Sequence, residues 1–197
     1  MSDNLNKSEQ KEEIEHLVIY IDGKNNIKNV KNYKSNEGKI NDICKENNTN
    51  NFIYIGEWTN DMREGKGTYY NPITKEKYEG EFKNGKAEGK GIFYYNNGDI
   101  YKGEFKNWNK EGFGIYFYHN GDRYEGDYRN GKKDGKGILY YKDGDRYEGD
   151  WRNDKKEGKG IYYFNNGDRM MGDYYNGQPI GKCIMLKRDG DIKVNNY

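Results

Sequence analysis

Apolar and charged residues alternate along most of this chain in short runs that end at Gly, Asn and Asp. Residues 78–83 read YEGEFK, so Tyr, Gly and Phe alternate with charged residues, which is typical of a β-strand with one wet face. The pair Asn84-Gly85 marks a turn, residues 86–95 form a second alternating run, and residues 96–99 (NNGD) turn the chain again. No stretch has the period of a helix, so the pattern predicts consecutive β-hairpins.

The hairpin pattern recurs with a fixed period. Residues 124–146 read YEGDYRNGKKDGKGILYYKDGDR and residues 147–169 continue as YEGDWRNDKKEGKGIYYFNNGDR, so the unit is 23 residues long. A period of this length predicts stacked modules and not a single globular core. The last copy is degraded, because Met170 replaces the tyrosine that opens the others. The same register yields six copies, at residues 54–77, 78–100, 101–123, 124–146, 147–169 and 170–192.

Glycines recur on the predicted inner face of each hairpin. Gly80, Gly89 and Gly91 share a face with Tyr78 and Phe82 if the alternation holds. Because glycine weakens an ordinary strand, we infer that the missing side chains leave slots in which neighbouring rings lie flat on the backbone. This packing would replace the core that a second sheet usually provides. Two strands per copy, at about 4.8 Å each, make the predicted sheet a twisted ribbon about 60 Å long.

The residues outside the repeats divide into three segments. Residues 1–13 are polar and charged, and we expect a disordered tail. Residues 14–53 are rich in Asn and Lys, and their apolar island at 14–22 (IEHLVIYID) predicts a short strand that caps the open edge of the first copy. The alternative is that this island binds a partner. Residues 193–197 are predicted to be a C-terminal tail.

Composition narrows the classes of function. A hydrophobic content of 32% would suggest disorder, but 16% aromatic residues recurring in register argue for a folded chain. A formal net charge of +1 favours neither nucleic acid nor an anionic surface. The two cysteines, Cys44 and Cys183, have no metal-ligand spacing, which suggests a reduced, cytoplasmic protein. The longest apolar run, residues 17–21, is far too short to span a membrane.

The motif Y-E-G-[DE]-[FYW]-x-N-G-K-x-x-G-x-G, present at residues 78–91 and 124–137, resembles the MORN (membrane occupation and recognition nexus) repeat. The resemblance covers residues 54–192 and leaves residues 1–53 outside. It implies an all-β fold: an elongated, single-layer, twisted antiparallel sheet of consecutive hairpins. It also implies a scaffold or a membrane-associated interaction module. Members of the family occur in cytoskeletal and ciliary assemblies, and some dimerise through terminal repeats.

Signatures of catalysis were sought in the sequence and none was found. Glycine-rich strings such as EGKGIYYFNNG do not have the order of a phosphate-binding loop. The two histidines, His16 and His119, have no recurring cysteine or acidic partner, so neither a metal site nor a nucleophile is predicted. Some lipid kinases and methyltransferases carry MORN repeats beside a catalytic domain, but this sequence has no remaining length for one. We therefore expect a protein that is not an enzyme and has no cofactor.

Aromatic residues supply two candidate partner sites. Trp108 replaces the turn glycine of the third copy, and Phe113 replaces the lysine found at Lys90 in the second copy. Exposed rings in polar surroundings are candidate interface anchors, although the two could instead pack on each other across the hairpin. The first-strand rings should form a stripe, largely structural, whose groove accepts a helix or an extended segment. These rings are Tyr78, Phe82, Tyr101, Phe105, Tyr124, Tyr128, Tyr147 and Trp151.

Charged residues gather at the two sets of turns. The pattern predicts one acidic edge, with Asp99, Asp122, Asp145 and Asp168, and one basic edge. A basic edge would attract anionic headgroups by about 1 kcal/mol per cation, but acidic residues such as Glu88 lie in the same turns and cancel part of this. A mixed, solvated surface is the alternative. The residues of the basic edge are Lys83, Lys86, Arg129, Lys132, Lys133, Arg152, Lys155 and Lys156.

These observations favour a non-enzymatic scaffold that binds a protein partner along the aromatic groove, in a cytoskeletal or ciliary assembly. The first alternative is a peripheral adaptor on the cytoplasmic face of a membrane, which binds phosphoinositides through the basic edge. A weaker alternative is an accessory subunit of a lipid kinase. A homodimer through the terminal repeats is also open, because the last repeat exposes a strand edge.

Overall fold

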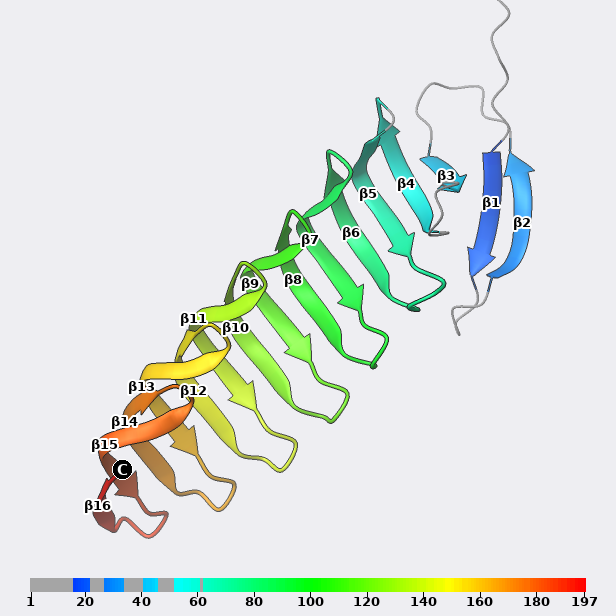
Figure 1. The fold of residues 1–197 in the computed structure, drawn as a ribbon. Helices are drawn as coiled ribbons and strands as arrows, with labels where there is room; N and C mark the ends of the chain where they lie inside the picture. The colour runs from blue at the N-terminus through cyan, green and yellow to red at the C-terminus, as the bar shows by residue number, and fades with distance from the viewer. Residues whose placement is uncertain (1–15, 22–26, 34–40, 46–51, 61) are drawn as a thin grey trace, which may run out of the picture.

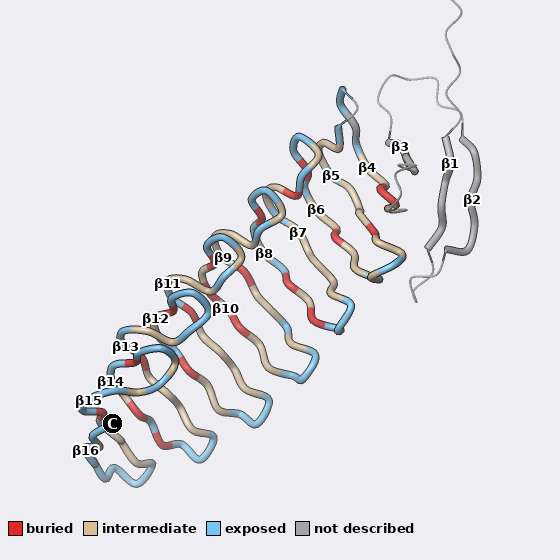
Figure 2. Tube along the Cα trace, viewed as in Figure 1, coloured by how far each residue is buried: buried red, intermediate tan, exposed pale blue. Residues whose placement is uncertain are grey.

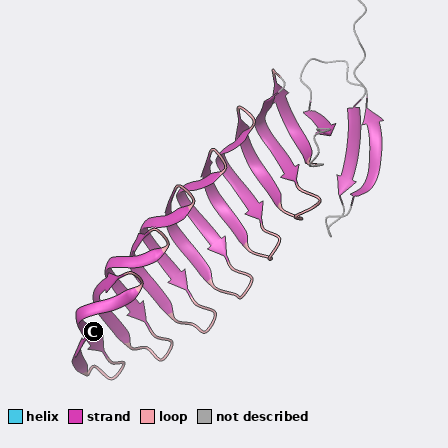
Figure 3. Cartoon of the chain, viewed as in Figure 1, coloured by secondary structure: helices cyan, strands magenta, loops and turns pink. Residues whose placement is uncertain are grey.

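The computed structural model describes residues 16–21, 27–33, 41–45, 52–60 and 62–197. The tail predicted at residues 1–13 lies outside these residues. The described part of the chain contains strands and no helix (Figure 3). Fourteen of these strands form one open antiparallel sheet in strict chain order, from β3 to β16, and β1 pairs with β2 in a separate sheet (Figure 1). The predicted single-layer sheet of consecutive hairpins is confirmed.

Each copy contributes two strands, a shorter first strand and a longer second strand. The strands are β1 (His16–Ile21), β2 (Ile27–Tyr33), β3 (Asn41–Lys45), β4 (Ile53–Thr59), β5 (Met62–Tyr70), β6 (Lys77–Lys83), β7 (Lys86–Tyr94), β8 (Ile100–Lys106), β9 (Asn109–Phe117), β10 (Arg123–Arg129), β11 (Lys132–Tyr140), β12 (Arg146–Arg152), β13 (Lys155–Tyr163), β14 (Arg169–Tyr175), β15 (Gln178–Leu186) and β16 (Ile192–Asn196). In the second copy, Asn84 (φ 49°) and Gly85 (φ 76°) form the two-residue turn between β6 and β7. Two positive φ angles in succession match the turn that best follows the strand twist.

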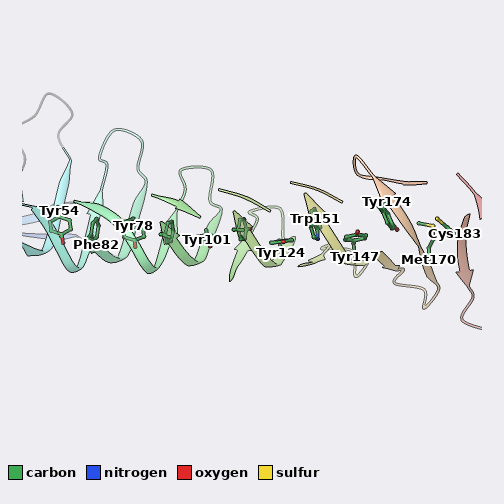
Figure 4. Close-up of a cluster of buried hydrophobic side chains, with 13 residues drawn as sticks. Tyr54, Tyr78, Phe82, Tyr101, Tyr124, Tyr147, Trp151, Met170, Tyr174 and Cys183 are labelled. Atoms are coloured by element: carbon green, nitrogen blue, oxygen red, sulfur yellow. The ribbon is translucent and has the colours of Figure 1, made fainter. Parts of the chain in front are cut away.

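A bulge bends every hairpin at the same place. Gly80 faces Gly91, but Phe82 faces Ala87, so three residues of β7 lie opposite one residue of β6. Gly89 lies inside this bulge with φ +73°, a conformation that L side chains rarely adopt. Its role is therefore to allow the bulge, and the prediction that it provides a slot for a ring is wrong. Bulges bend a sheet, and here the strands curve around a row of side chains (Figure 4).

The core is a row of tyrosines lying on glycine pairs. The Tyr78 side chain is fully buried, and a Cβ added at Gly80 would lie 2.5 Å from its hydroxyl oxygen. The Tyr78 hydroxyl donates a 2.9 Å hydrogen bond to the carbonyl of Glu81, which holds the ring flat over the glycines. The predicted packing of rings on glycine is confirmed at Gly80 and Gly91. Figure 2 shows the buried positions recurring along the ribbon.

Edge-on ring contacts join each copy to the next. The Tyr78 ring packs against Phe82 of its own copy at 5.1 Å and against Phe105 of the next copy at 4.9 Å, nearly perpendicular to both. Tyr101 repeats the pattern with Phe105 and with Tyr128, each at 5.1 Å. Edge-to-face contacts of this kind stabilise beyond their buried area. The core is therefore one continuous file of rings (Figure 4).

The last copy fills the same slot with different atoms. Met170 stands at the tyrosine position, and the fully buried Cys183 stands where the other copies have a glycine. A Cβ at the opposite Gly172 would overlap the Cys183 sulfur. Cysteine is tolerated here because no ring covers the backbone. Residues 193–197, predicted to be a tail, instead belong mostly to β16, which pairs with β15.

The first edge of the large sheet is capped by a strand other than the predicted one. Residues 16–21 do form β1, but β1 pairs with β2 and not with the first copy. The capping strand is β3, in which Ile43 pairs with Ile55 of β4. No strand was predicted in this Asn- and Lys-rich stretch, because the strand predicted within residues 14–53 lay at residues 14–22.

Candidate functional site

Acidic side chains at the hairpin turns hold successive copies together. The backbone N–H of Asn84 donates to the Glu64 carboxylate of the preceding copy at 2.9 Å, and that of Asn107 donates to Glu88 at 3.1 Å. Three further pairs repeat this bond: Asn130 with Glu111, Asn153 with Asp134, and Asn176 with Glu157. These acids are therefore structural, in addition to offsetting neighbouring lysines.

The predicted acidic edge is a second line of bonds between copies. Asp99 accepts hydrogen bonds from the backbone N–H of His119 and from the Tyr116 hydroxyl, both at 2.8 Å. Burial alone would raise the pKa of Asp99, but its hydrogen bonds from His119, Tyr116 and Asn97 together lower it. Asp122, Asp145 and Asp168 accept equivalent backbone bonds from the following copies. These carboxylates are engaged within the fold, so this edge is not a free acidic surface.

The first-strand rings predicted to line a partner groove form the core. Their exposed fractions lie between 0% and 5%, which leaves no surface for a partner. The prediction of a groove along these rings is therefore wrong, although the prediction that they are largely structural was correct. The buried rings are Tyr78, Phe82, Tyr101, Phe105, Tyr124, Tyr128, Tyr147 and Trp151.

Trp108 and Phe113 lie on opposite faces of the sheet. The Trp108 ring packs back onto the preceding copies, 5.2 Å from Tyr69 and 5.4 Å from Tyr78, and so joins the core face. Phe113 lies on the other face and is 55% exposed. The two rings therefore do not pack on each other across the hairpin. Of these two rings, Phe113 is the exposed one and remains the candidate interface anchor.

The residues of the predicted basic edge separate into two groups. Six are exposed near the hairpin turns: Lys83, Lys86, Arg129, Lys132, Arg152 and Lys155. Lys133 and Lys156 instead lie half-buried on the core face, where the Lys133 ammonium is 4.8 Å from the Trp151 ring centre and that of Lys156 is 4.6 Å from the Tyr147 ring centre. Strand alternation carries this signal, because each follows an exposed lysine and must point the other way.

Lys110, which the sequence analysis did not select, continues the same row. Its ammonium lies 4.7 Å from the Tyr116 ring centre and 5.1 Å from that of Tyr128. Burial lowers the pKa of Lys110 and of Lys133. Burial, followed by the charge of Lys133, lowers the pKa of Lys156 to about 8. We call Lys110, Lys133 and Lys156 the inner lysine row.

A groove runs along the opposite, outer face of the sheet. Its largest part spans the third to sixth copies with a volume of about 960 Å³. Its floor is the line of glycine pairs, such as Gly137 and Gly149, where no outward side chain fills the space. One wall carries isoleucines, Met171 and the carboxylates of Glu125 and Glu148, and the other carries Lys and Asp side chains. We call this feature the outer groove.

The outer groove continues toward the N-terminal copies. A part of about 440 Å³ is lined by Gly91, Ile92, Gly103 and Phe113, and a part of about 360 Å³ by residues including Thr68. Phe113 borders both this second part and the largest part. The signal that could have found the outer groove is the isoleucine after Gly-x-Gly in the second to fifth copies, which alternation places on the face away from the rings.

Two kinds of site were looked for in the described residues and not found. Within the described ranges, no group of three or more His, Cys, Asp or Glu side chains could hold a metal ion. No helix in the same residues is long and apolar enough to cross a membrane.

Comparison with known families identifies the class of this protein. The MORN repeat model matches residues 54–73, 78–100, 101–123, 124–146, 147–169 and 171–192. The chain therefore belongs to the MORN repeat family. No curated protein sequence matches the chain.

Among solved structures, the chain is similar to TCP domains of two species. The TCP domain of Drosophila melanogaster SAS-4 (dCPAP), in complex with a proline-rich motif of Ana2 (dSTIL), is 14% identical with a TM-score of 0.46, covering 81% of this chain and 88% of that chain. The TCP10 domain of Danio rerio CPAP, in complex with a STIL peptide, is 14% identical with a TM-score of 0.48, covering 75% of this chain and 64% of that chain.

Proposed function

We propose that this MORN protein is a non-enzymatic scaffold that binds an extended segment of a protein partner in the outer groove. The observation that carries the proposal is an apolar groove that continues from copy to copy with an exposed ring, Phe113, at its middle. Exposed apolar surface bordered by polar residues is typical of interaction sites. The proposed partner site therefore lies on the face opposite the core rings, and not along those rings as the sequence predicted.

The width of the outer groove favours an extended segment over a helix. The two walls come from residues two apart on one strand, such as Glu148 and Asp150, so they stand about 7 Å apart. A helix with side chains is about 10 Å or more across. An extended chain fits this width, and the glycine floor allows its backbone to approach closely.

The charged wall of the outer groove is largely neutralised. Lys136 pairs with Asp150 across neighbouring strands at 2.5 Å, and Lys159 pairs with Asp173 at 3.3 Å. Exposed pairs of this kind contribute little to stability, but they leave no strong net charge along the wall. The partner is therefore expected to be apolar in the outer groove, and binding to be little affected by salt.

Residues that stand at equivalent positions in other copies provide test substitutions that we expect the fold to tolerate. Phe113→Lys introduces the residue that other copies have at this position, and Ile138→Thr introduces the residue of the first copy, Thr68. Peptides selected from a random display library on the wild-type chain are then measured against the double variant by fluorescence anisotropy. We expect a loss of about tenfold or more, as for the removal of interface anchors.

The matched control is Ile73→Lys, which removes a 70% exposed isoleucine outside the outer groove. This variant should bind the selected peptides as tightly as the wild type. If Ile73→Lys weakens binding as much as the double variant does, the outer groove is not the site. Selected peptides that bind the double variant at wild-type affinity would also overturn the proposal.

We also propose that the last copy mediates association of two chains. Large apolar residues gather there: Tyr175, Ile180, Ile184, Ile192, Val194 and Tyr197 are each more than 40% exposed. The strand β16 is also an unpaired sheet edge, which can template pairing with a second chain. Light scattering at high concentration tests this, and a monomeric mass would refute it. Phosphoinositide binding and a place in a cytoskeletal or ciliary assembly stay predictions.

A further inference from the structure

In the residues that the structure describes, the inner lysine row consists of cations without a carboxylate or hydrogen-bond partner. In the described part of the chain, no carboxylate lies within ion-pair distance of the Lys110, Lys133 or Lys156 ammonium groups, and none of these groups makes a hydrogen bond. The carboxylate that most affects the row, Asp154, accepts a bond from the backbone N–H of Lys133 and does not pair with an ammonium. Each ammonium lies over aromatic rings on the face opposite the outer groove.

An unpaired, half-buried lysine is not needed to cover these rings. The second copy has Ala87 at this position, and there the apolar Trp108 ring packs on Tyr78 and Phe82 instead. Partial desolvation of each ammonium costs stability, and cation–π contacts offset this cost only in part. An apolar side chain would therefore cover the rings at lower cost. The row is better explained by a ligand that supplies the missing negative charge.

The spacing of the row indicates the shape of that ligand. Successive lysines are one copy, or two strands, apart, which is about 10 Å. In an extended polyproline II segment, three residues per turn at about 3.1 Å each place every third side chain on one face at about 9 Å, close to this spacing. We propose that the inner lysine row binds an extended acidic polypeptide segment that carries Asp or Glu at every third position. This surface is separate from the outer groove and does not depend on it.

An anionic membrane surface fits the inner lysine row less well. The ammonium groups are half-buried among rings on the core face, whereas the cations Lys86, Lys132 and Lys155 at the hairpin turns are exposed. A flat anionic bilayer would meet the exposed lysines first. A single extended chain can follow the concave face, and its carboxylates can reach the recessed row.

The test compares two triple variants with the same change in charge. Lys110→Met, Lys133→Met and Lys156→Met together remove the inner lysine row but keep the side-chain stems over the rings. The control combines Lys86→Met, Lys132→Met and Lys155→Met, which are exposed residues at the first positions of β7, β11 and β13. The probe is a labelled synthetic peptide with Glu at every third position, and a second peptide has the same composition with its Glu residues clustered.

We expect the periodic peptide to bind the wild type more tightly than the clustered peptide. The inner variant should lose more than about tenfold in affinity, while the control and Phe113→Lys should each change it by less than about threefold. The inner variant should melt at or above the wild-type temperature, because it removes partly desolvated charges, so a loss of binding is not a loss of fold. If it unfolds, Lys133→Met alone replaces it.

Three outcomes would overturn the proposal. The first is an equal loss in the inner and control variants, which would mean unspecific attraction. The second is equal binding of the two peptides. The third is binding of phosphatidylserine vesicles that depends on the inner lysine row while neither peptide binds, which would assign the row to a lipid surface.

Discussion

The tyrosine on its glycine pair is the unit from which this protein is built. Tyr124 lies over Gly126 and Gly137, and its hydroxyl bonds to the carbonyl of Asp127 at 3.2 Å. A Cβ at Gly137 would lie 2.5 Å from the Tyr124 ring carbon that bears the hydroxyl. The glycine is required for space and not for an unusual backbone angle.

Gly137→Val should therefore destabilise the chain by about 3 kcal/mol or more, because the ring cannot move without losing its neighbours. Gly137→Cys should also destabilise it. Adding Tyr124→Met to Gly137→Cys copies the pair that the last repeat has in Met170 and Cys183, and should recover part of the loss. Thermal melts of the three variants check this. No recovery in the double variant would contradict the idea of a shared slot.

Buried tyrosines also make stability depend on pH. Burial raises the pKa of Tyr54, Tyr95 and Tyr141 from 10.0 to about 12 each, and those of Tyr78, Tyr101 and Tyr147 higher still. Above pH 10 the unfolded chain releases tyrosyl protons that the folded chain retains, so the free energy of unfolding falls as pH rises toward the folded pKa values.

We expect the melting temperature to fall steeply between pH 10 and about pH 12. Below that range, the lowered pKa of Lys156, about 8, has the opposite effect. Stability should rise slightly from pH 8 to pH 10, and Lys156→Met should remove that rise. A melting temperature that is flat above pH 10 would contradict the burial of these hydroxyl groups.

Each hairpin combines a two-residue turn, a bulge and bonds to the neighbouring turns. In the third copy, backbone strain in the turn opposes side-chain packing. The turn contains Trp108 with φ 69° instead of glycine. A non-glycine residue in this conformation costs about 1–2 kcal/mol. The cost is offset by the contacts of the ring with Tyr69, Tyr78 and Phe82.

Trp108→Gly tests which of these effects is larger. Loss of the packed ring costs about 3–5 kcal/mol, which exceeds the relief of backbone strain, so we expect a net destabilisation of about 2 kcal/mol in chemical unfolding. Adding Ala87→Lys introduces the lysine of the later copies and should restore part of the stability by covering Tyr78. A Trp108→Gly variant as stable as the wild type would show that the strain is the larger effect.

The complete ribbon is a stack of repeated units, each joined to its neighbours by short-range contacts. The contacts that cross between copies are local: ring pairs in the core, and carboxylate bonds at both edges. Stability should then depend on the number of copies and on the unbroken order of first and second strands.

Deletion of residues 124–146 removes one complete copy and should leave a folded chain with a modestly lower melting temperature. Deletion of residues 123–131 removes β10 and its turn, so two second strands become neighbours and Gly137 loses the tyrosine that covers it. This shorter deletion should be the more damaging one. Circular dichroism melts compare the two, and the reverse order would contradict a stack of two-strand units.

The partner surfaces were harder to predict than the fold, because strand alternation assigns a face but not the degree of burial. The first-strand rings share one face as predicted, yet the bulge bends the sheet until they are covered. The same bend leaves the isoleucines of the other face, such as Ile184, beside an open line of glycines. The sequence pattern predicts a sheet of one layer, but it does not determine which of the two faces the sheet encloses.

The 23-residue period, the hairpins, the turns and the packing of rings on glycine follow from local chemistry, and so could be inferred from the order of residues. Contacts between copies and outside the repeats depend on curvature and on pairing between distant segments. These decided that β3 and not residues 16–21 caps the sheet, that Lys133 lies over rings while Lys132 is exposed, and that Phe113 and Trp108 face opposite sides. Local patterns carry no information about how far a sheet bends, and that bend separates core from surface in this protein.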